Sequence, residues 1–448
     1  MRERGTSSPW LRSLIYLGLA VPLLYPFLVS GRRSETFVDE VAFISAGHAA
    51  VTRLLQGDLN GPAWNANDWA SYGWPNPMLA KLLLGTSIYA TGHGGREYGT
   101  WVNKLPGADE AEVRGARWPG ILLGWGSCML LLAIGFRISV FTGVVASLYA
   151  AYNSNYVWCC ALAMLEGPLM FFMVLTLLLA LRLKDSLYAG AESRKILMRS
   201  IALGASAAGA VSAKLNGGAI FLFAAAVPAL LAASAAAGSP PPPRARTALA
   251  ATAAVLLVTA LGFYVLNPQF HRHPLSQLRT TFRYWQSLPP FEPATQPPMP
   301  RWKSFKIVTT EMLSGMTTTK QLFRPVFDLA AQRWPVQKGQ FEKYYVERTG
   351  SIEGLLMAVA VLVIGRARWI RGRRARISDE ETFLLSAIFV WTATIAWMPI
   401  VQGRYFLPPF VTTPLLVAVG LRTVGASLKR IVGRRDDLDP AMNPSLQG

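Results

Sequence analysis

Two adjacent carboxylates, Asp39 and Glu40, stand just after the first long apolar segment of the chain. Thr36 precedes Asp39 by three residues, a spacing typical of a helix start. We therefore expect Asp39 in a first helical turn, where the positive end of the helix favours the ionised carboxylate. A charged base would then face the membrane interface. The same pair also fits a plain helix cap at a membrane surface, so other residues have to decide between the two interpretations.

Four more ionisable residues stand at or near the ends of apolar segments: Lys81, Glu166, Lys214 and Arg404. Ionisable groups at the edge of a hydrophobic span cost free energy, and they usually line a cavity or pair with one another. Salt bridges that hold helix ends would explain any one of them. Together with Asp39 and Glu40 they make three acids and three bases at one membrane depth. This set favours a polar site instead, because stability alone does not require charges of both signs on one face of the membrane.

The composition indicates which elements position these residues. The chain has 448 residues, 52% of them hydrophobic and 15% charged, with a mean hydropathy of +0.30. These values are typical of an integral membrane protein. The net charge of +19 is explained by basic residues that collect in the cytoplasmic loops of such proteins, so we expect no nucleic-acid partner.

Apolar runs long enough to span a bilayer, about 20 residues each, predict an all-α polytopic protein. We find ten, at about 11–29, 117–136, 138–157, 160–181, 199–213, 216–236, 247–266, 352–365, 382–400 and 405–421. Residues 1–448 then form a single transmembrane domain. The short basic connections all fall on one side, which predicts cytoplasmic termini and extracytoplasmic loops at about 30–116 and 267–350. The first apolar segment lacks a cleavage site and is interpreted as an anchor in the plasma (inner) membrane.

The first outer loop is expected to hold two interfacial helices. Apolar residues keep helical spacing from Asp39 to Leu55, and a second run begins at Pro77 with Asn76 as its cap. The second run stops by Gly92, about 15 residues on, and is too short to cross a bilayer. Lys81 would lie near its start, within reach of the Asp39 helix. The three cysteines fall in or beside apolar segments and imply no disulfide.

At these positions the sequence resembles the membrane glycosyltransferases of the C type (GT-C), in particular the protein O-mannosyltransferase and aminoarabinose-transferase kind that use polyprenyl-phosphate sugars. The resemblance rests on the Asp39-Glu40 pair and on four short segments, 76–81, 165–172, 212–217 and 402–408. Three residues depart from the family pattern: Asn76 replaces a His, Met78 replaces a Pro, and Glu166 stands where the mannosyltransferases have Asp.

The resemblance implies an inverting transfer of a sugar from a polyprenyl-phosphate carrier to a hydroxyl acceptor of the cell envelope, whether protein, lipid or glycan. Asp39 would be the catalytic base. Lys81, Lys214 and Arg404 would hold the phosphate, and Glu40 and Glu166 would orient the sugar or the acceptor, or hold a divalent metal. The histidines His271 and His273 make no clear ligand set, and the cofactor stays open.

Two alternatives stay open at this point: a secondary transporter and a lipid-binding scaffold without catalytic activity. A transporter would place its substrate charges near the bilayer midplane. A scaffold could keep the basic groups but would not need Asp39. Convergence of the charged residues on one outer cavity would favour the transferase.

Overall fold

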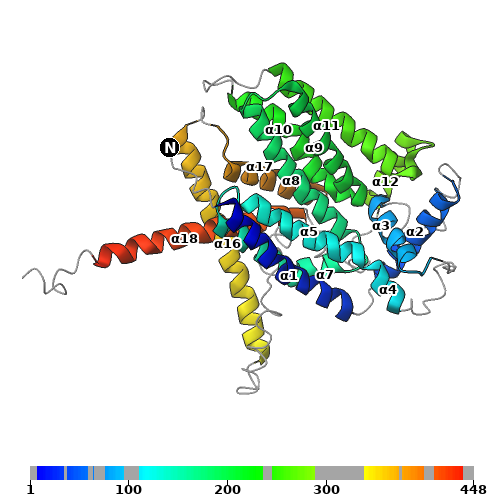
Figure 1. The fold of residues 1–448 in the computed structure, drawn as a ribbon, viewed down its shortest axis with the longest axis horizontal. Coiled ribbons are helices and arrows are strands. Elements are labelled where there is room, and N and C mark those ends of the chain that lie inside the picture. The colour runs from blue at the N-terminus through cyan, green and yellow to red at the C-terminus, as the bar shows by residue number, and fades with distance from the viewer. Residues whose placement is uncertain are drawn as a thin grey trace, which may run out of the picture.

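The structure is a computed structural model that describes residues 8–34, 38–58, 64, 76–94, 110–235, 245–287, 338–372, 376–397 and 408–436. This part of the chain is helical and contains no strand (Figure 1). The all-α fold class predicted from the sequence is confirmed.

Most of the helices coincide with apolar runs of the sequence, whereas Glu110–Ala116 (α4) and Pro274–Ser287 (α12) are rich in polar residues. Their bounds are α1 Pro9–Arg33, α2 Val38–Leu55, α3 Leu79–Ala90, α4 Glu110–Ala116, α5 Trp118–Gly135, α6 Val140–Ala151, α7 Ser154–Ala161, α8 Glu166–Tyr188, α9 Ser193–Ala213, α10 Gly218–Ala235, α11 Ala245–Leu266, α12 Pro274–Ser287, α16 Lys338–Arg371, α17 Asp379–Trp397 and α18 Thr413–Asp436. In the described segments, the 3-10 turns η3 Leu215–Gly217, η4 Pro268–Phe270 and η7 Pro408–Val411 lie between these helices.

Five helices in the described part are long and apolar enough to cross a membrane. They are Pro9–Arg33, Ala111–Gly135, Glu166–Tyr188, Ser193–Ala213 and Arg246–Leu266. The total of ten spans and the single-domain boundaries stay predictions.

Four neighbouring helices form the central bundle. α8 packs on α9 and α10, and α11 packs on α9 and α10, as Figure 1 shows in green. α5 lies against α8, while the short helices α2, α3 and α4 gather at one end of the bundle, where α3 contacts α9.

Two glycine contacts bring the site-bearing helices close together. α2 and α3 cross at Gly47 and Gly85, where a Cβ atom on Gly85 would overlap the Gly47 carbonyl. α5 and α8 approach at Gly120 and Gly167, where a Cβ atom on Gly167 would lie 2.8 Å from Cα of Gly120. Side chains at these positions would push the helices apart, so the close approach depends on glycine.

The third and fourth predicted spans differ from the structure. The chain breaks at Asn153, whose side-chain oxygen accepts a hydrogen bond from the Tyr156 N–H at 3.0 Å and starts the separate short helix α7. Residues 162–165 then bend, so α8 begins at Glu166 and not near residue 160. The predicted start of α3 was also wrong by two residues: Met78 occupies the cap position, and it makes no side-chain cap bond.

Candidate active site

Glu40 is held by Arg117, a residue that the sequence did not single out. Arg117 donates from Nε and Nη2 to the two carboxylate oxygens of Glu40, at 2.8 and 2.7 Å, and both side chains are buried. Its Nη1 donates to the carbonyls of Gly31 and Ser34 at 2.8 and 2.9 Å, where α1 ends. The Ala163 N–H donates to Glu40 Oε1 at 2.7 Å. Glu40 and Arg117 together therefore tie α1, α2, α5 and the bend before α8 to one another.

Asp39 is the neighbour of Glu40 in α2. The helix begins at Val38, so the expected place of Asp39 in a first helical turn is confirmed. The side chain of Asp39 lies outside the described residues. The contacts of Glu40 fix the backbone at this point of α2.

Glu166 and Lys214 form a buried ion pair. Nζ of Lys214 lies 2.6 Å from Oε1 of Glu166, and the two residues are only 6% and 2% exposed. Glu166 is the first residue of α8, where the helix dipole favours a carboxylate. Lys214 ends α9 in an extended conformation, with φ −159° and ψ 141°, and η3 follows. The turn between α9 and α10 thus presents the lysine to the start of α8.

Lys81 is completely buried near the start of α3. Its Nζ donates to the carbonyl of Asn76 at 2.6 Å. Burial lowers the pKa of Lys81 well below its ordinary value, because the ammonium form loses its hydration. An anion beside Nζ would raise the pKa of Lys81 towards its ordinary value.

The segment after α11 connects the two lysines. Asn267 accepts a hydrogen bond from the Met78 N–H at 2.7 Å and donates to Ser212 Oγ at 2.9 Å. Gln269 donates to the carbonyl of Asn76 at 3.3 Å. Its Oε1 is buried and has no hydrogen-bond partner in the described part of the chain. Gln269 thus offers a buried acceptor beside the carbonyl that binds Lys81.

Hydrogen bonds and short stretches of chain connect all of these groups. Glu40 accepts a hydrogen bond from Ala163, which lies three residues before Glu166, and Glu166 binds Lys214. Two residues before Lys214, Ser212 binds Asn267. Asn267 in turn binds the Met78 N–H, three residues before Lys81. Four of the six candidate residues therefore gather at the end of the bundle where α8 begins and where α9 and α11 end. Arg404 lies outside the described residues. Pro408, four residues later, is buried in η7, which contacts α8.

Sequence reasoning missed Arg117, Asn267 and Gln269. Arg117 resembled an ordinary basic residue beside a span. Asn267 did carry a signal, since a polar amide directly after an apolar run and before proline must find hydrogen-bond partners when buried.

In the described residues, no group of three or more His, Cys, Asp or Glu side chains is placed to hold a metal ion. Between η4 and α12, His271 is half-buried and His273 is exposed, and His271 Nε2 is 2.9 Å from the Tyr264 carbonyl oxygen. The three cysteines are buried, and none of them forms a disulfide within the part of the chain that the structure describes.

Part of the chain is similar in sequence to a known protein family. Residues 69–273 match the family model described as dolichyl-phosphate-mannose-protein mannosyltransferase. No curated protein matches the chain. The matched range holds Lys81, Glu166 and Lys214 but not Asp39, Glu40 or Arg404.

Two solved structures of ArnT from Cupriavidus metallidurans resemble the fold. The structure bound to undecaprenyl phosphate has a TM-score of 0.52 and 14% identity, covering 95% of this chain and 63% of that chain. The apo structure has a TM-score of 0.50 and 14% identity, covering 97% of this chain and 65% of that chain. The chain thus spans slightly less than two thirds of the ArnT length. The expected resemblance and the GT-C fold are confirmed, and the chain is a multi-pass membrane protein.

Proposed function

We propose that the chain is an inverting glycosyltransferase that moves a sugar from a polyprenyl-phosphate carrier to a hydroxyl acceptor. The observation that carries the proposal is the gathering of Glu40, Lys81, Glu166 and Lys214 at one end of a GT-C bundle. Their placement at a bundle end also favours a transferase over a transporter, whose site is expected near the midplane. By the predicted topology, this end is extracytoplasmic.

In the proposed reaction, the acceptor hydroxyl oxygen attacks the anomeric carbon from the side opposite the phosphate. The new carbon–oxygen bond forms as the bond to the phosphate oxygen breaks, and the phosphate leaves with the electron pair. The hydroxyl proton passes to the carboxylate of Asp39. Direct displacement inverts the anomeric configuration. The departing phosphate needs cations more than a proton donor.

We assign the cations to Lys81, Lys214 and Arg404. Lys81 is buried with a lowered pKa, so a phosphate at its Nζ would favour the ammonium form and bind in a site with little competing water. Lys214 is kept in position by Glu166 at 2.6 Å. Arg404 is the residue best suited to a bidentate phosphate contact.

We assign different roles to the two glutamates. Both oxygens of Glu40 already accept hydrogen bonds from Arg117, and one also accepts from Ala163, which supports a positioning role for Glu40 on behalf of Asp39. Glu166 orients Lys214. Oε1 of Gln269, which has no hydrogen-bond partner among the described residues, is proposed to accept a hydrogen bond from a sugar hydroxyl.

Donor binding by purified variants tests this proposal. Lys81→Ala is expected to weaken binding of undecaprenyl phosphate by roughly ten- to a hundredfold, since a buried contact between a cation and a phosphate contributes about 1.5–3 kcal/mol. The matched control is Lys429→Ala, which removes an exposed lysine of α18. Equal affinities of the two variants, with sugar transfer at the parent rate, would refute the phosphate assignment.

A further inference from the structure

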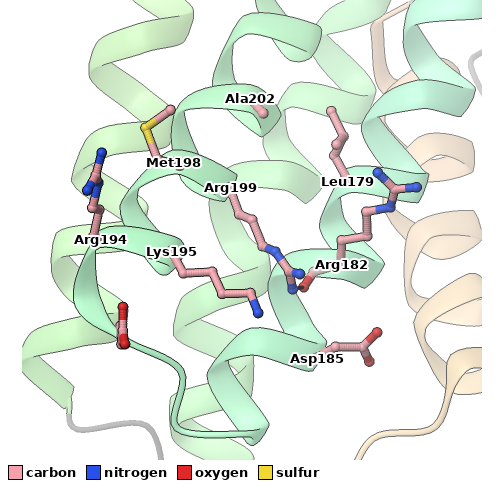
Figure 2. Close-up of a pocket in the computed structure, with 9 residues that line it drawn as sticks. Leu179, Arg182, Asp185, Arg194, Lys195, Met198, Arg199 and Ala202 are labelled. Carbon is pink, nitrogen blue, oxygen red and sulfur yellow. Dashed lines mark hydrogen bonds between the residues drawn. The ribbon is translucent and has the colours of Figure 1, made fainter.

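A second polar region lies at the opposite end of α8 from Glu166. The chain from Glu166 to Arg182 runs roughly 24 Å along the helix axis, at 1.5 Å per residue. There α8 and α9 border an open, surface-exposed cavity of about 640 Å³ (Figure 2). Its lining residues are Leu179, Arg182, Asp185, Glu192, Arg194, Lys195, Met198, Arg199 and Ala202. The proposed transfer reaction makes no use of this cavity.

The residues that line the cavity carry a net positive charge. Four of its lining residues are Lys or Arg, and two are acidic. One of the acids, Asp185, already forms an ion pair with Arg137 at 2.8 Å. Figure 2 shows Lys195 and Arg199 extending from α9 towards α8. The remaining positive charge favours an anion in this cavity.

Arg199 is held in place while the other bases stay accessible. Its Nη1 donates to the Arg182 carbonyl at 2.5 Å and also to Ser186 Oγ. A guanidinium has five N–H donors, so Arg199 keeps others for a ligand. Arg182, Arg194 and Lys195 have exposed side chains. A fixed arginine beside three accessible bases is a suitable arrangement for a phosphate group.

The lining changes from charged to apolar along the helices. Arg194 and Lys195 lie in the first turn of α9, whereas Met198 and Ala202 lie one and two turns further into the bundle. On α8, Leu179 lies one to two turns deeper than Asp185. The outer surface of α9 is apolar here, with Leu197 50% and Met198 59% exposed. A ligand with an anionic head and an apolar body matches this gradient, and a small soluble anion does not.

We propose that this cavity binds the headgroup phosphate of an anionic phospholipid, with its glycerol and acyl portion against Leu179, Met198 and Ala202. The position agrees with the predicted topology, which places this end of the bundle at the cytoplasmic leaflet. Basic pockets between helices on that side are suited to anionic lipid headgroups. The site is separate from the proposed active site and does not depend on the transfer reaction.

Native mass spectrometry of the full-length protein in detergent tests the proposal, with phosphatidylglycerol and phosphatidylcholine as the two probes. The wild type is expected to bind phosphatidylglycerol more tightly. The variant Arg182→Gln/Arg194→Gln/Lys195→Gln is expected to lose about fivefold in affinity for each removed charge, on the order of a hundredfold in total. The variant Arg246→Gln/Lys429→Gln/Arg430→Gln removes three exposed charges outside the cavity and is expected to bind as the wild type does.

If the triple variant fails to fold, Arg194→Gln/Lys195→Gln replaces two exposed residues and should still lose about 25-fold. Equal loss of phosphatidylglycerol in the cavity variant and the control variant would overturn the proposal. Equal affinity of the wild type for both lipids would overturn it as well. Displacement of phosphatidylglycerol by inorganic phosphate at a similar concentration would assign the cavity to a soluble anion and reject the lipid.

Discussion

Nζ of Lys214 lies 2.6 Å from Oε1 of Glu166, and both side chains are buried at the end of the bundle where α8 begins and α9 ends. The two residues stand 48 positions apart in the sequence. Their contact is the structural centre of the proposed site, because it connects the bend that carries Ala163 with the segment that leads to Asn267.

Breaking this pair from one side should cost more stability than removing both partners. Lys214→Met leaves a buried carboxylate without its cation and is expected to destabilise the fold by about 3–5 kcal/mol, as is Glu166→Met. The double variant should recover much of the loss, since neither member of the pair is left buried without the other, yet it should remain inactive. Unfolding midpoints and sugar transfer measured on all three variants check this. Additive losses would show that the two residues do not act as a pair.

Arg117→Lys should disturb the site through its support of Glu40. A lysine cannot make the bidentate contact or reach both carbonyls at the end of α1, so we expect a loss of about 1.5–3 kcal/mol and reduced transfer. Arg114→Lys is the matched control, because Arg114 is exposed three residues earlier. Thermal unfolding and turnover are the measurements. A variant as stable and as active as the control would contradict the positioning role.

Donor binding should take up a proton at Lys81. Burial lowers the pKa of Lys81 in the free protein, and a bound phosphate raises it by favouring the ammonium. Affinity for undecaprenyl phosphate should then fall as the pH rises from the lowered pKa of the free protein towards that of the complex, by up to tenfold per pH unit. Calorimetry in buffers of different ionisation enthalpy measures the uptake. Lys81→Met should abolish it, and unchanged uptake in that variant would exclude Lys81 as the source.

The predicted topology places both long loops outside the cell. Asn65→Cys and Ala294→Cys should react with a membrane-impermeant maleimide in intact cells. The native cysteines Cys128, Cys159 and Cys160 are buried, so the background should be low. Labelling that occurs only after lysis would reverse the orientation of the site.

The sequence identified the ionisable residues of the site better than their partners. Glu166 and Lys214 were recognisable because charge is costly at the end of an apolar run, which a local pattern can show. That they bind each other depends on how α8 packs on α9, which no local pattern contains. Arg117 was overlooked because a basic residue before a span is common in membrane proteins. α7 was missed because an eight-residue apolar helix after Asn153 reads as part of a longer span.

Sugar transfer by Asp39→Asn tests the central proposal most directly. Asn can still accept hydrogen bonds in the first turn of α2, so the unfolding midpoint should stay close to that of the parent. The amide cannot take the acceptor's proton, so transfer from a polyprenyl-phosphate donor should fall roughly a hundred- to ten-thousandfold. Glu40→Gln should lose more stability than Asp39→Asn does, because the change weakens the contact between residue 40 and Arg117. It should reduce sugar transfer less than Asp39→Asn does. Near-normal turnover by correctly folded Asp39→Asn would contradict the catalytic assignment.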